Sequence, residues 1–255
     1  MDWTIEHLIE TDSTNGWLRE HRSEADHVVW ADYQTAGRGC GTNSWESERG
    51  KNLLFSVLIH PVEVRAADQF ILSMANALAL RDTIASYVDD VKIKWPNDIY
   101  WKDCKICGTL IETTLKGQFV KDCIIGTGIN VNQALFLSDA PNPVSLRQIL
   151  GHDTDCREVL RKVLDNIAKY MDRVGACVEG DLQSPVSVRT ADWDTIRACY
   201  RAHLYRLGET WHYRFADGSV EQCKLVNVTD DGHLELLHDS GEVRRFAFKE
   251  VQFVI

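Results

Sequence analysis

The chain has 255 residues, 44% of them hydrophobic, which is enough for a substantial buried core. Its formal net charge of −10 argues against a general nucleic-acid binder, because such proteins usually present a basic face. The N-terminus lacks the basic and apolar regions of a signal peptide, and no apolar run approaches the roughly 20 residues that span a bilayer. We therefore expect a cytoplasmic protein with no membrane partner.

The apolar spacing predicts a mixture of strands and helices over the first 205 residues. Strands are expected at residues 3–9, 28–33, 52–60, 91–95, 98–101, 106–115 and 119–132. Helices are expected from residues 12–14 to His21, over 64–88 as a long amphipathic helix, and over 155–174 and 192–204.

The pattern changes after Gly208. Short β-rich pieces alternate with turns at 217–218, 230–232 and 239–241, a spacing typical of a small all-β barrel of about 50 residues. We therefore expect two domains, 1–205 and 206–255.

A glycine-rich loop is expected between the strands at 28–33 and 52–60. It carries three alternating glycines, Gly37, Gly39 and Gly41, together with Arg38 and Trp45. Glycine lets backbone N–H groups approach an anion closely, and arginine pairs with carboxylate or phosphate oxygens. An ordinary hairpin loop is the alternative interpretation.

Two further segments combine strands with turn or glycine signals. The turn Trp95-Pro96-Asn97-Asp98 is followed by Lys105 and Gly108 at the start of a strand. Residues 124–132 form a strand pattern interrupted by Gly126 and Gly128, and glycine inside a strand indicates a bulge or a ligand against the backbone.

The eight cysteines are scattered, so reduced thiols are expected. The CxxC pair Cys104 and Cys107 has no second pair or matching histidines, and we expect no metal or redox role for it. The nine histidines fall outside the motifs above and are interpreted as surface or core residues.

Taken in order, these motifs resemble those of the biotin–protein ligases. The resemblance rests on 13–15 (Ser-Thr-Asn), Gln34 with 37–39 (Gly-Arg-Gly), 94–98 (Lys-Trp-Pro-Asn-Asp), Lys105 with Gly108, and 126–130 (Gly-Thr-Gly-Ile-Asn). The chain departs from the family pattern at 40–42 (Cys-Gly-Thr), where relatives usually carry more basic or polar side chains.

The resemblance implies an α+β fold: a mixed β-sheet catalytic domain packed with helices, followed by an SH3-like barrel. There is no room before residue 3 for the helix-turn-helix domain of some relatives, so we expect a ligase with no specific DNA binding. The resemblance leaves open whether the protein is a homodimer.

The implied reaction has two steps. Biotin and ATP form biotinyl-5'-AMP, which then acylates a specific lysine of a biotin carboxyl carrier protein; Mg²⁺ is the expected metal. The first step brings two anions together and so requires cationic groups.

The resemblance also implies the site residues. The catalytic candidates are Arg38 and Lys105. The biotin-binding candidates are Ser13, Thr14, Asn15, Gln34, Gly37, Arg38, Gly39, Lys105 and Gly108. The ATP-binding candidates are Arg38, Trp45, Asn97, Asp98, Lys105 and Asn130, with Asp98 also the candidate metal ligand.

Structural roles compete with several of these assignments. Ser13 and Thr14 can cap a helix, Trp45 can pack the loop, and Asn97 and Asp98 can serve the turn. A lipoate ligase or octanoyltransferase of the same fold is the nearest alternative. A non-catalytic sensor and a structural protein with a peptide-binding barrel are more distant ones.

Overall fold

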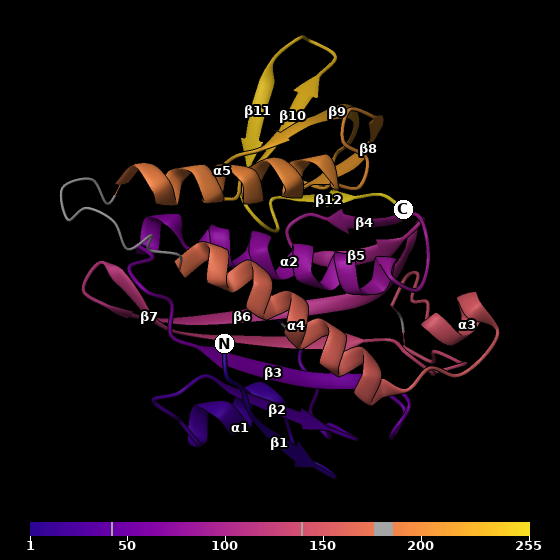
Figure 1. Cartoon of the computed structure of the whole chain (residues 1–255). Helices are drawn as coiled ribbons and strands as arrows, with labels where there is room; N and C mark the ends of the chain where they lie inside the picture. The colour runs from indigo at the N-terminus through magenta and orange to yellow at the C-terminus, as the bar shows by residue number, and fades with distance from the viewer. Residues whose placement is uncertain (42, 139, 176–185) are drawn as a thin grey trace.

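The computed structural model describes residues 1–41, 43–138, 140–175 and 186–255, without the side chains of 186–191. A seven-stranded mixed sheet forms the centre of the larger unit, in the order β1-β2-β3-β7-β6-β5-β4 (Figure 1). Its strands are β1 (Thr4–Leu8), β2 (His27–Ala31), β3 (Leu53–Ile59), β4 (Val91–Lys94), β5 (Asp98–Trp101), β6 (Cys104–Lys116) and β7 (Phe119–Ile129). The pair β1–β2 is parallel and the other pairs are antiparallel.

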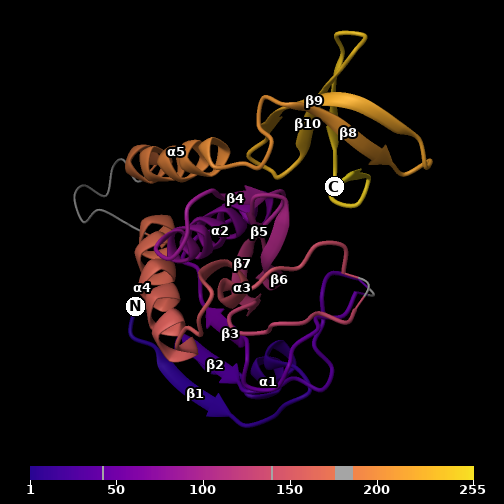
Figure 2. The ribbon, with the colours of Figure 1, turned by 90° about the vertical axis from the view of Figure 1, so that its right-hand side faces the viewer.

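Helices cover both faces of this sheet. They are α1 (Thr14–Glu20), the 3₁₀ turn η1 (Ala66–Asp68), α2 (Phe70–Ala85), α3 (Leu146–Leu150), α4 (Cys156–Gly175) and α5 (Val186–Ala202). α2 and α4 lie on one face and α1 on the other (Figure 2). Alternation along β3 supports this layering, because Phe55 and Val57 join the large core while Leu58 packs with Leu18 of α1. No helix among the described residues is long and apolar enough to cross a membrane.

The helix expected over 64–88 differs from the prediction. A 3₁₀ turn comes first, and α2 begins only at Phe70. The predicted amphipathic character is wrong, because residues 71–80 are all buried. α2 contacts α4 and α5 as well as strands of the sheet, so it has no broad solvent-facing side. α5 begins at Val186, before the expected residue 192.

The C-terminal region forms the expected small all-β unit beyond the β4 edge of the main sheet (Figure 2). Its strands are β8 (Thr210–Phe215), β9 (Val220–Val228), β10 (Leu234–His238), β11 (Val243–Phe246) and β12 (Val251–Phe253). They make an antiparallel sheet in the order β11-β10-β9-β8-β12. The strands β11 and β12 are at opposite ends of this order, so the expected barrel is an open sheet rather than a closed one.

Side chains of the main domain hold the C-terminal sheet in place. The Trp95 indole N–H donates to the Gly232 carbonyl at 2.9 Å, and the Arg201 guanidinium donates to the Val228 carbonyl at 2.8 Å. The chain passes from α5 to β8 across residues 203–209, and we propose the domain boundary, 1–205 and 206–255, in this segment.

Candidate functional site

The N-terminus of α1 presents a buried polar cluster to one face of the sheet. Ser13 caps the helix, its Oγ accepting from the Gly16 N–H at 3.4 Å. Thr14 points inward, and its N–H and hydroxyl donate to Gln34 Oε1 at 2.7 and 3.1 Å. Ser13 therefore caps the helix, while the adjacent Thr14 presents its polar groups to the interior.

The Asn15 amide is held on both sides by residues that the sequence analysis did not select. Its Nδ2 donates to Glu112 Oε2 at 2.8 Å, and its Oδ1 accepts from the Ser56 hydroxyl at 2.6 Å. The sequence contained a signal for each. Ser56 is the single polar residue of the fully buried strand β3, and Glu112 shares a strand face with Gly108 by period-two alternation.

Gly126 provides the space for this amide. A methyl group at Gly126 would lie 2.1 Å from Asn15 Oδ1. The β3–β7 and β6–β7 ladders run through Gly126 and Gly128 in continuous register, so these glycines serve close approach rather than a bulge.

The Trp45 indole lies against the next part of the same face. Gly108 and Gly128 are cross-strand partners, and methyl groups there would lie 2.7 and 2.4 Å from the indole ring. Trp45 thus packs the loop against the sheet, and its ring covers the Gly108 surface expected for biotin. The backbone N–H of Trp45 donates to the Gly37 carbonyl at 2.9 Å, which closes the loop on itself.

A cationic group lies beyond the indole. Lys105 Nζ lies 5.8 Å from the Trp45 ring centroid and 2.7 Å from Asp98 Oδ2. Lys94 lies opposite Asp98 across β4 and β5, so two lysines flank one carboxylate. Burial lowers the pKa of Lys94, although the Asp98 charge opposes that shift. When both lysines are protonated, their two positive charges face a single carboxylate, which leaves positive charge available for an anionic ligand.

Arg38 is separate from this group. Its side chain is exposed and has no hydrogen bond or ion pair with any other described residue. Its backbone forms an isolated β-bridge with Ser44, which brings the two sides of the glycine loop together. Gly39 lies within the segment that this bridge closes. The structure thus places Arg38 on the loop but does not bring it to Lys105.

Two other ATP-binding candidates have structural contacts here. Asn97 Nδ2 lies 3.4 Å from the Ser73 hydroxyl of α2. Asn130 is buried, and its Nδ2 donates to the Val144 carbonyl at 3.1 Å while its Oδ1 has no partner among the described residues. That oxygen is a buried acceptor without a partner among the described residues.

The C-terminal sheet contributes a cation that the sequence analysis also missed. A methyl group at Gly41 would lie 2.5 Å from Lys249 Nζ, so the lysine amine lies over the glycine loop. Lys249 follows β11, far from Gly41 in the sequence, so the sequence alone gave no sign that the two residues meet.

A magnesium ion finds few protein ligands in this region. Asp98 offers a carboxylate, and one of its oxygens contacts Lys105. Mg²⁺ commonly binds through one or two carboxylates together with substrate phosphates, and Asp98 fits such a minor role.

Residues 7–130 match the model of the biotin/lipoate A/B protein ligase family. The bifunctional ligase/repressor BirA of Bacillus subtilis is 32% identical over 241 residues, which cover 92% of this chain and 68% of BirA. The biotin–[acetyl-CoA-carboxylase] ligase of Paracoccus denitrificans is 29% identical, with 88% of this chain and 90% of the relative covered.

The fold agrees with the sequence relatives. The biotin protein ligase of Aquifex aeolicus, solved in complex with biotin and ATP, superimposes with a TM-score of 0.77 at 26% identity. The alignment covers 98% of this chain and 99% of that structure. The site and fold thus define a ligase of the biotin/lipoate type. Within that class, the chain belongs to the biotin–protein ligase family.

Proposed function

We propose that the protein uses ATP to attach biotin to a lysine of a biotin carboxyl carrier domain through biotinyl-5'-AMP. One observation carries this proposal. On one face of the sheet, the polar Asn15 cluster, the glycine floor under Trp45 and the Lys105–Asp98 pair follow one another. Biotin has the matching order of groups: a ureido ring, an apolar body and a carboxylate.

The polar end suits the ureido group. That group offers N–H donors and a carbonyl acceptor, and the hydroxyls, amides and carboxylate around Asn15 provide both complements. Glu112 can accept from a ureido N–H. The Ser56 hydroxyl, which here donates to Asn15, and the Thr14 hydroxyl, which here donates to Gln34, can donate to the ureido carbonyl after rotation about the C–O bond. We assign Ser13 to the helix cap and Gln34 to the orientation of Thr14.

The cationic end suits the first chemical step. A biotin carboxylate oxygen attacks the α-phosphorus of ATP, the bond to the β-phosphate oxygen breaks, and pyrophosphate leaves. Both reactants are anions, so the Lys105 ammonium stabilises the charge that they bring together. Arg38, exposed on the loop, joins this clamp only when the loop closes over the ligands.

In the second step the carrier lysine amine attacks the acyl carbon of biotinyl-AMP. The C–O bond to the phosphate breaks, AMP leaves, and the amine loses a proton. The proposed contacts to the nucleotide are Asn97, Asp98 and Asn130. We also propose that the Trp45 ring moves off Gly108 and Gly128 and then packs against the intermediate.

Pyrophosphate release with ATP and Mg²⁺ tests the proposal when biotin, lipoate and octanoate are compared. We expect release with biotin alone, and biotin on the lysine of an added carrier domain by mass spectrometry. Turnover with lipoate or octanoate in place of biotin would favour the alternative acyl ligase of the same fold. Release without any acid would contradict both.

A further inference from the structure

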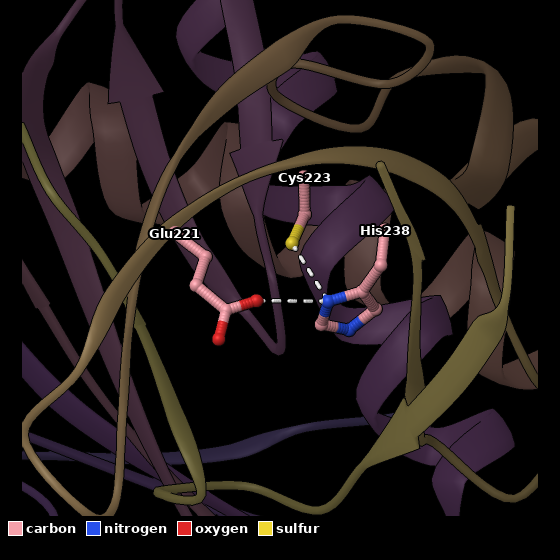
Figure 3. Close-up of side chains that lie close together, drawn as sticks. All are labelled: Glu221, Cys223 and His238. Atoms are coloured by element: carbon pink, nitrogen blue, oxygen red, sulfur yellow. Dashed lines mark hydrogen bonds and ion pairs between the residues drawn. The ribbon is translucent and has the colours of Figure 1, made fainter. Parts of the chain in front are cut away.

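A second constellation of reactive side chains lies in the C-terminal sheet, away from the proposed ligase site. Cys223 of β9 is the cross-strand partner of His238 at the end of β10. Glu221 precedes Cys223 by two residues, so its side chain is on the same strand face. Figure 3 shows the three side chains pointing toward one another, with the imidazole Nδ1 between the carboxylate and the sulfur.

The two distances from the imidazole nitrogen to its neighbours are close to those of a tetrahedral metal centre. His238 Nδ1 lies 3.5 Å from Cys223 Sγ and 3.1 Å from Glu221 Oε2. Zinc bonds of about 2.3 Å to sulfur and about 2.0–2.1 Å to nitrogen and oxygen, at tetrahedral angles, separate nitrogen from sulfur by about 3.5 Å and from oxygen by about 3.3 Å. Among the described residues, this is the group of His, Cys and acidic side chains whose ligand atoms all lie within 4.8 Å of one another.

Two of the three side chains are buried and packed, and the third borders a hollow through which an ion can enter. Cys223 and His238 are 1% and 8% exposed, and the imidazole packs against Phe215 and Phe246. Glu221 is exposed and borders a hollow of about 520 Å³, which Asp239 and Glu242 also line. The buried ligands are thus held in place, while the fourth coordination position opens toward water.

The charges also favour a cation. The carboxylates of Glu221, Asp239 and Glu242 line the hollow beside the cluster. Arg244 is the one basic side chain that lines the hollow besides His238. A divalent metal would neutralise the carboxylate and stabilise the thiolate.

We propose that Glu221, Cys223 and His238 form a Zn²⁺ site with a solvent molecule as the fourth ligand. Binding displaces the thiol proton to solvent, and Nδ1 donates its lone pair to the metal while the imidazole proton resides on Nε2. The thiolate and carboxylate together balance the two positive charges. Because the ligands come from two neighbouring strands, the ion cross-links β9 and β10 of the open C-terminal sheet.

Cobalt titration of the full-length, chelator-treated protein tests the site without reference to ligase activity. We expect one Co²⁺ per chain, with the intense visible bands of a tetrahedral ion and a thiolate charge-transfer band, and Zn²⁺ should displace the cobalt. Glu221→Gln changes an exposed side chain and should preserve the fold, yet weaken Zn²⁺ binding at least 10-fold in competition with a chromophoric chelator.

Cys223→Ser should abolish the charge-transfer band. Cys104→Ser is the matched control, because Cys104 and Cys107 have the CxxC spacing of a thiolate metal site and could otherwise account for the band. The band should survive in this control. A wild-type protein without the band, unchanged Zn²⁺ affinity in Glu221→Gln, or loss of the band in Cys104→Ser alone would overturn the proposal. If Cys223→Ser does not fold, the Glu221→Gln result decides.

Discussion

Gly126→Ala is the substitution whose effect the geometry defines most sharply. The added methyl carbon would lie 2.1 Å from Asn15 Oδ1, whereas ordinary contact begins at 3.4 Å. The amide must therefore move by about 1.3 Å. Its hydrogen bonds to Ser56 and Glu112, 2.6 and 2.8 Å long, cannot both survive such a movement.

The expected loss of stability follows from those contacts. Each net hydrogen bond contributes about 1 kcal/mol, and a buried polar group left unpaired costs about 1–3 kcal/mol more. We expect the free energy of unfolding to fall by about 2–4 kcal/mol in urea denaturation. Displacement of one ureido partner should also weaken biotin binding about 5-fold or more in calorimetry, while the KM for ATP changes little.

Gly175→Ala provides the control. Gly175 ends helix α4, and among the described residues, apart from the chain neighbours and the helix's own backbone, no heavy atom lies within 4 Å of the position that a methyl group would take. Its substitution should change stability by less than about 1 kcal/mol. The close-approach argument is refuted if Gly126→Ala matches this control in both unfolding free energy and biotin affinity.

The remaining predictions concern cations. Lys105→Met should lower the turnover of pyrophosphate release about 10²–10³-fold while Lys105→Arg retains more activity; normal turnover in Lys105→Met would remove the lysine from the mechanism. Lys94→Met should raise unfolding stability at neutral pH. The pKa of Lys94 is lowered in the folded protein, so between that pKa and 10.5 the unfolded state binds more protons and wild-type stability rises with pH. The difference in unfolding free energy between Lys94→Met and wild type should therefore become smaller at alkaline pH in denaturation curves. A difference that does not change with pH would contradict the argument that the Lys94 charge is desolvated in the folded protein. Lys249→Ala should raise the KM for ATP without changing the melting temperature, because its amine lies over Gly41 of the loop; an unchanged KM would separate the C-terminal sheet from catalysis.

The sequence alone determined the elements and the order of the motifs. Period-two and helical spacing identified the strands of the main sheet and helix α4, because these signals depend only on neighbouring residues. The glycines and the motif order indicated the family, which the comparisons confirm. The same local signals failed at α2, where burial on several sides removed the amphipathic contrast that the prediction assumed.

The tertiary structure decided which side chains meet. Ser56 and Glu112 reach Asn15 from strands 41 and 97 residues away, and Lys249 reaches the loop from the other sheet. Trp45 covers the glycine floor, and a histidine assigned only to surface or core completes the cluster with Cys223. Spacing along a chain does not encode such contacts, because they arise from the pairing order of strands and the stacking of layers.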